Sequence, residues 1–211
     1  MGRLSIATAL LAVCTSLFAQ APAPKNMATV LGFSYDLPSD WTVVEAKPSS
    51  QEVKTAPEQA PVTEEQKKGT ACIQVALTAM HGTPSSVVVV VALPFDCYGQ
   101  TMSDQDLKGF GSGAADGLKQ TFDLVQPVYG VYSLGSHHLW IERAKGSPKG
   151  KPETQYTMEI TCSMLRKGAA CWMTLAADEA SLHAFESGRV TLDGEAATQL
   201  VPASAFNQAP S

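Results

Sequence analysis

The stretch that decides the fold is Ala71–Cys97, ACIQVALTAMHGTPSSVVVVVALPFDC. It predicts two apolar strands, Cys72–Met80 and Val87–Leu93, joined by a connector (81–86) of turn-forming residues. A strand with one solvent-exposed face would alternate apolar and polar residues. The unbroken valine run therefore predicts a strand inside the sheet, covered on both faces.

Two cysteines stand at the open end of this predicted hairpin. If Met80 pairs near Val87, Cys72 falls opposite residue 95, within two residues of Cys97. Cross-strand neighbours at that separation are close enough for a disulfide. We therefore predict a Cys72–Cys97 bond.

The clearest alternation in the chain lies further on and predicts a second disulfide. One row of the strand near residues 155–164 is apolar (Tyr156, Met158, Ile160, Cys162, Met164), and the other is polar. Arg166–Gly168 turns the chain back, and the return strand has its own apolar row (Cys171, Met173, Leu175). Since Cys162 and Cys171 share a face on adjacent strands, we predict that they pair. The alternative is four free buried thiols.

The first residues are typical of an export signal. Arg3 is followed by an apolar core, Ile6–Phe18, which is too short to anchor the mature protein in a bilayer. We expect a signal peptide over 1–19, cleaved after Ala19 or Ala21, and a periplasmic or extracellular location. Cys14 only loosely resembles a lipoprotein site, because Val13 before it is not small, so lipidation is the less favoured alternative.

Charge and length restrict the function classes. Arg3 is the only charged residue in 1–19, so the mature chain carries 14 basic and 20 acidic residues. An acidic chain without a basic block gives no reason to expect nucleic acid as a partner. The 211-residue length suits a single domain, here 28–201, preceded by a disordered linker (20–27) and followed by a tail (202–211). We expect a monomer with no integral membrane span after cleavage.

The remaining elements alternate between strands, loops and two helices. Residues 31–45 predict strand, turn and strand, and polar 47–69 predicts a long surface loop. Ser103 is a predicted N-cap, followed by a helical apolar stripe: Leu107, Phe110, Ala114, Leu118, Phe122. Strands follow at Leu124–Leu134 and His138–Ala144, then a loop at Lys145–Pro152, and finally a short helix, Glu179–Ser187, capped by Asp178.

The opening segment Gly32-Phe-Ser-Tyr-Asp-Leu-Pro-Ser-Asp-Trp41 is similar to the opening motif of the PsbP-like superfamily, which includes PsbP and the exported DcrB-like proteins. The element order over 28–200 agrees with this resemblance. It implies an α+β fold, an α/β/α sandwich with a mostly antiparallel sheet of about six strands and helices on both faces. It also implies binding or assembly rather than catalysis. The motif is structural and transfers no functional residue, and the two predicted disulfides are not part of the general family pattern.

No catalytic, metal or cofactor site stands out in the sequence. His137 and His138 are adjacent on a strand and point to opposite faces, so they do not easily share one ion. Arg143 is expected to pair with an acid such as Glu159 across the sheet rather than anchor a substrate. Trp140 and Trp172 are expected in the core. If they instead line a groove, Trp140, Glu142, Trp172 and His138 form the candidate binding site.

These observations favour an exported, non-catalytic binding or assembly-accessory protein of the cell envelope. Its partner would be another envelope protein or an unknown small ligand. One alternative is an envelope hydrolase that uses carboxylates or histidines in a cleft. A second alternative is a structural or stress-related envelope protein.

Overall fold

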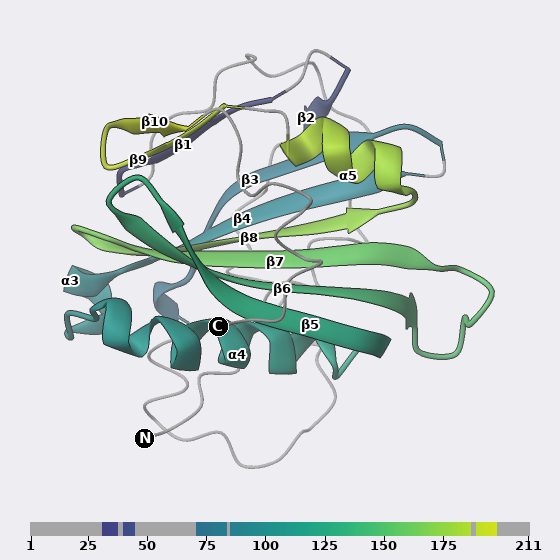
Figure 1. The fold of residues 1–211 in the computed structure, drawn as a ribbon, viewed down its shortest axis with the longest axis horizontal. Helices are drawn as coiled ribbons and strands as arrows, with labels where there is room; N and C mark the ends of the chain where they lie inside the picture. Colours follow the sequence, from purple (N-terminus) through teal and green to yellow (C-terminus); the bar gives the residue numbers. More distant parts are fainter. Residues whose placement is uncertain (1–30, 38–39, 45–70, 84, 187–188, 198–211) are drawn as a thin grey trace.

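The computed structural model describes residues 31–37, 40–44, 71–83, 85–186 and 189–197. Its main feature is a seven-stranded antiparallel sheet in the order β2-β3-β4-β8-β7-β6-β5 (Figure 1). These strands are β2 (Thr42–Val44), β3 (Gln74–His81), β4 (Ser86–Pro94), β5 (Phe122–Leu134), β6 (His137–Pro148), β7 (Tyr156–Leu165) and β8 (Gly168–Ala176). The α+β fold class is therefore confirmed, with seven strands in the main sheet instead of about six.

The valine strand lies in the interior of this sheet, as predicted. β4 is hydrogen-bonded to β3 on one side and to β8 on the other, and Met80 lies opposite Val87. Val88–Val91 are at most 5% exposed. Both faces of β4 are covered, which is why the run needs no polar alternation.

Both predicted disulfides are present. Cys72 and Cys97 are joined with a Cα–Cα distance of 5.6 Å. Cys162 and Cys171 lie directly opposite each other on β7 and β8, with a Cα–Cα distance of 4.1 Å. The first bond ties the residues just before β3 to the short helix α3 (Phe95–Tyr98) that follows β4, and the second joins two central strands.

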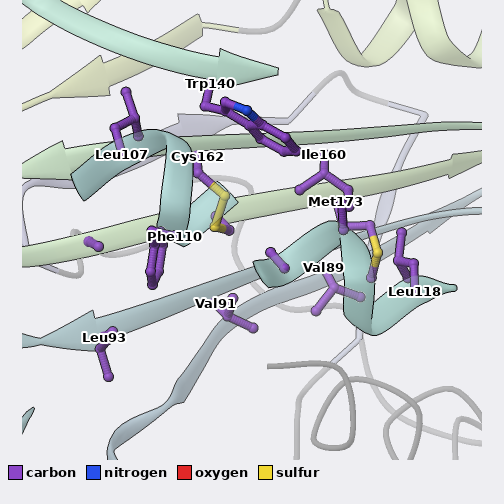
Figure 2. Close-up of a cluster of buried hydrophobic side chains, with 14 of the residues drawn as sticks. Val89, Val91, Leu93, Leu107, Phe110, Leu118, Trp140, Ile160, Cys162 and Met173 are labelled. Carbon is purple, nitrogen blue, oxygen red and sulfur yellow. A yellow bond between two sulfur atoms is a disulfide. The ribbon is translucent and has the colours of Figure 1, made fainter. Parts of the chain in front are cut away.

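Helix α4 (Asp104–Leu118) covers one face of the sheet, which we call the α4 face (Figures 1 and 2). Ser103 caps it, and the Ser103 backbone N–H donates to the Asp106 carboxylate at 2.9 Å. The predicted stripe is buried through Leu118, but Phe122 belongs to β5. The core under α4 contains Val89, Val91, Leu107, Phe110, Leu118, Trp140, Ile160, Cys162 and Met173.

The opposite face is packed against a small three-stranded sheet, in the order β1-β9-β10. Its strands are β1 (Phe33–Asp36), β9 (Arg189–Leu192) and β10 (Glu195–Ala197). Phe33, Tyr35, Val190 and Leu192 form one core with β4, β6 and β8 of the main sheet. Helix α5 (Glu179–Glu186) contacts β8, and Asp178 caps it by accepting the Ser181 N–H at 2.7 Å. A sandwich with helices on both faces is not confirmed.

Two local predictions were wrong. β1 and the return strand β2 do not form a hairpin: β1 pairs with β9 and β2 pairs with β3. The predicted loop Lys145–Pro152 is partly strand, because β6 continues to Pro148 opposite β5. Long-range pairing partners decided both cases, and local turn residues do not reveal them. The predicted signal (1–19), linker (20–27), loop (47–69) and tail (202–211) lie outside the described residues.

Two glycines of α4, Gly109 and Gly111, allow the same substitution to be compared at an open and at a tightly packed position. A Cβ added at Gly111 would overlap ring atoms of Trp140, whereas one added at Gly109 would meet nothing within 4 Å. We expect Gly109→Ala to stabilise the protein by about 0.5–1 kcal/mol through helix propensity. Gly111→Ala should destabilise it by about 1–3 kcal/mol through overpacking. Urea unfolding of both variants measures the difference, and equal effects would contradict this packing of α4.

The two disulfides should differ in their contribution to stability because they close loops of different length, with sequence separations of 25 and 9. Loop entropy predicts losses of about 3.5 kcal/mol for Cys72→Ala with Cys97→Ala, and about 2.7 kcal/mol for Cys162→Ala with Cys171→Ala. Chemical denaturation of the two double variants measures this. Peptides that link Cys72 to Cys162 in non-reducing mass mapping would contradict the pairing itself.

Candidate interaction surface

The last strand of the main sheet has an open edge. β5 is bonded to β6 on one side, and among the described residues no strand pairs with its outer side (Figure 1). An unpaired edge presents a row of backbone N–H and C=O groups that another chain can pair with.

Exposed large apolar side chains gather on β5. Among the residues whose side-chain exposure the structure describes, the exposed large hydrophobic ones are Val125 (56%), Val128 (45%), Tyr129 (50%) and Val131 (47%). Tyr129 and Val131 lie on the α4 face, opposite Glu142 and Trp140, and Val128 lies on the other face, opposite Arg143. We call these four residues and the outer edge of β5 the β5 surface.

A bulge lies within this surface, between Val125 and the other three residues. The β5–β6 register shifts between Val125 and Val128, where Gln126 has a φ of 50° and Pro127 cannot donate a hydrogen bond. Beyond the bulge, 127–134 (PVYGVYSL) contains no charged residue. Charged side chains are a common protection of exposed edges, and this stretch lacks them.

Behind the surface lies a buried carboxyl group. Glu142 on β6 is directly opposite Tyr129 and only 7% exposed, and its Oε1 atom is buried without a hydrogen-bond partner. The Tyr129 ring stacks on Trp140, with centroids 6.4 Å apart. An exposed aromatic ring and an unsatisfied carboxyl oxygen are thus neighbours at one end of the sheet.

Burial raises the pKa of Glu142 above its ordinary value, because desolvation disfavours the charged form. Two charges at the C-terminal end of α4 act on it as well. Lys119 lowers the pKa of Glu142 and Asp116 raises it. Lys119 also donates to the Asp116 carboxylate at 2.9 Å, so its charge is shared with a second acid.

The structure brings together three of the four residues of the candidate groove. His138, Trp140 and Glu142 follow one another on the α4 face of β6, with Trp140 1% exposed. Trp172, also 1% exposed, lies on the opposite face, 5.1 Å from Phe33 between ring centroids. Both tryptophans are therefore core residues, as the preferred interpretation of the sequence had it.

His138 and His81 each contact a different residue. His138 is half-exposed and its Nδ1 is 2.6 Å from Asp104 at the start of α4, while His81 stacks on Trp41. Across the part of the chain that the structure describes, no group of three or more His, Cys, Asp or Glu side chains could hold a metal ion.

The predicted Arg143–Glu159 pair is confirmed on the face opposite α4. Both the Nε and the Nη2 atoms of Arg143 donate to Glu159 Oε2, at 3.1 and 2.8 Å. Glu159 is 2% exposed, so the pair is buried and its charges satisfy each other. Thr161 donates to the second oxygen of the same carboxylate. These contacts give the pair a structural role.

Sequence reasoning did not identify the β5 surface. The absence of charge in 127–134 was a visible signal, but the same pattern would also suit a strand in the sheet interior. Only the strand order shows that β5 is at the edge.

Among the described residues, no helix has the length and apolar character needed to cross a membrane.

Comparison with known proteins gives similarity in fold alone. No protein-family model and no curated protein sequence matches the chain. Of the solved structures, LpqN of Mycobacterium tuberculosis, involved in cell envelope biogenesis, is 13% identical with a TM-score of 0.40, covering 75% of this chain and 83% of LpqN. Cyanobacterial PsbP (CyanoP) of Synechocystis sp. PCC 6803 is 11% identical with a TM-score of 0.38, covering 76% and 86%. Neither similarity is close enough to transfer a function.

The buried carboxyl group should be visible in the pH dependence of stability. The folded state has the higher pKa, so the ionised Glu142 destabilises the fold at high pH, and this penalty disappears as the pH falls below the ordinary value of 4.5. We expect Glu142→Gln to raise the unfolding free energy by about 1 kcal/mol at pH 8 and to have no effect near pH 4.

Urea unfolding at the two pH values measures this effect. Glu153→Gln, the same change at an exposed turn residue, should stay within about 0.5 kcal/mol of the original protein at both. A Glu142→Gln protein that is less stable at pH 8 would show that the carboxylate has a stabilising partner.

Proposed function

We propose that this chain is an exported, non-catalytic binding or assembly-accessory protein of the cell envelope, and that it holds a protein partner at the β5 surface. The observation that carries the proposal is the gathering of exposed apolar side chains on one edge strand. Within the described residues no strand covers this edge, and exposed apolar surface of this kind marks interaction sites.

The proposed location is supported by the cysteines and by the first residues of the chain. Two disulfides are typical of an oxidising compartment, and Ile6–Phe18 is typical of an export signal. Disulfides also suit an accessory protein outside the cytoplasm, since they stabilise the sheet that presents the surface.

Site-specific photo-crosslinking in the cell that produces the protein tests this function. A benzophenone amino acid at Val131, on β5, is compared with one at Thr42, an exposed residue of β2 at the opposite edge of the same sheet. We expect a discrete higher-mass adduct from position 131, lost when Val128→Lys places a charge on the edge, and none from position 42. No adduct from 131, or the same adduct from both edges, would reject the β5 surface as the binding site.

A further inference from the structure

We propose that the partner docks on β5 as an added β-strand and presents a basic side chain, arginine or lysine, to Tyr129 and Glu142. This inference rests on the proposed function and names the chemistry of the partner. Strand addition to an open edge is a common mode of peptide recognition, in which backbone hydrogen bonds give affinity and side-chain contacts give specificity.

The register of the sheet defines where that side chain would lie. Ile160 on β7, Glu142 on β6 and Tyr129 on β5 are successive members of one cross-strand row on the α4 face. An added strand would continue the row about 4.8 Å beyond β5. Its residue opposite Tyr129 would be next to that ring and two strands from Glu142, a span suited to a long side chain with a charged end.

The charged groups near this row favour the binding of a cation. Glu142 has a buried oxygen without a hydrogen-bond partner, and Asp116 is the second acid near it. Lys119 is a basic residue whose charge acts on Glu142, and its ammonium donates a hydrogen bond to Asp116. Among the described residues, these two acids and one base together carry one net negative charge when all three are ionised. A buried carboxylate oxygen without a hydrogen bond is costly, and an incoming guanidinium or ammonium group that donates to Oε1 would relieve that cost.

The aromatic residues favour the same ligand. Tyr129 is half-exposed, and its ring is backed by the buried Trp140. A cation over an aromatic face is attracted by the ring quadrupole, and arginine also stacks well on such a ring. The site therefore offers a side chain two attractive partners, one aromatic and one anionic.

Pairing of β5 with β5 of a second copy does not supply a cation to the site. Pairing β5 with β5 of another copy would bring no basic residue to Tyr129, because Asp123 is the one charged residue between Phe122 and Leu134. The whole chain carries a net charge of −5, which also favours a basic partner over itself.

Peptide binding tests the inference on the full mature chain with both disulfides formed. The probe is a fluorescein-labelled nonapeptide, Thr-Val-Thr-Val-Arg-Val-Thr-Val-Thr, and its control is the same peptide with Gln in place of Arg. Fluorescence anisotropy measures both. We expect the Arg peptide to bind about tenfold more tightly than the Gln peptide.

Variants assign that preference to the site. Glu142→Gln should reduce the preference to about twofold or less with little effect on the Gln peptide, and Tyr129→Leu should reduce it in part. Glu153→Gln, an exposed charge removal in the turn after β6, should leave it unchanged. Val128→Lys should weaken both peptides alike, because it places a charge on the edge itself. Circular dichroism confirms that each variant is folded.

The outcomes separate this inference from the proposed function. If the two peptides bind equally and Val128→Lys abolishes this binding, β5 remains the docking site. The proposal that the partner presents a basic side chain would then be wrong. A preference for Arg that survives Glu142→Gln would also overturn it. Binding of neither peptide, or binding that Val128→Lys does not affect, would count against the β5 surface as a whole. A concentration-dependent dimer that Val128→Lys abolishes would identify a second copy as the occupant and overturn the basic partner.

Discussion

The antiparallel register of β4, β8 and β7 is the constraint on which the rest of the structure depends. Val91 lies opposite Cys171, and Cys171 lies opposite Cys162. This alignment sends the odd-numbered valines of β4 toward α4 and the even-numbered ones toward the small sheet. Since side chains alternate with a period of two, a slip of one residue would exchange the faces, and the disulfide between β7 and β8 opposes that slip.

The same row of the sheet links the core to the proposed binding surface. It continues from Cys162 to Trp140 on β6 and from Trp140 to Val131 on β5. Gly111 allows α4 to approach Trp140 closely, and the Tyr129 ring stacks on the same residue. A rigid, well-packed support lies directly under the exposed side chains, so a partner strand would meet a surface that is already ordered.

The buried glutamates on the two faces of the sheet differ in their hydrogen-bond partners. On the face opposite α4, Glu159 is fully engaged by Arg143 and Thr161, which makes it part of the architecture. On the α4 face, Glu142 is comparably buried but its Oε1 has no partner. Both are β-strand glutamates, and neighbouring sequence does not distinguish them. The strand pairing places an arginine opposite one and a tyrosine opposite the other.

The sequence by itself determined the elements that follow from the spacing of apolar residues along the chain and from the strand face on which each cysteine lies. The valine hairpin, α4 with its Ser103 cap, the β7–β8 pair, both disulfides and the Arg143–Glu159 pair could all be predicted. Only the tertiary structure decided which strands are at the edges, that β1 pairs with β9, and that Trp140 and Trp172 lie on opposite faces. The physical reason is that alternation relates residues within a strand, whereas edge position and exposure depend on hydrogen-bonded neighbours distant in the chain. The β5 surface belongs to this second group, because an uncharged apolar strand has the same local pattern whether another strand covers it or not.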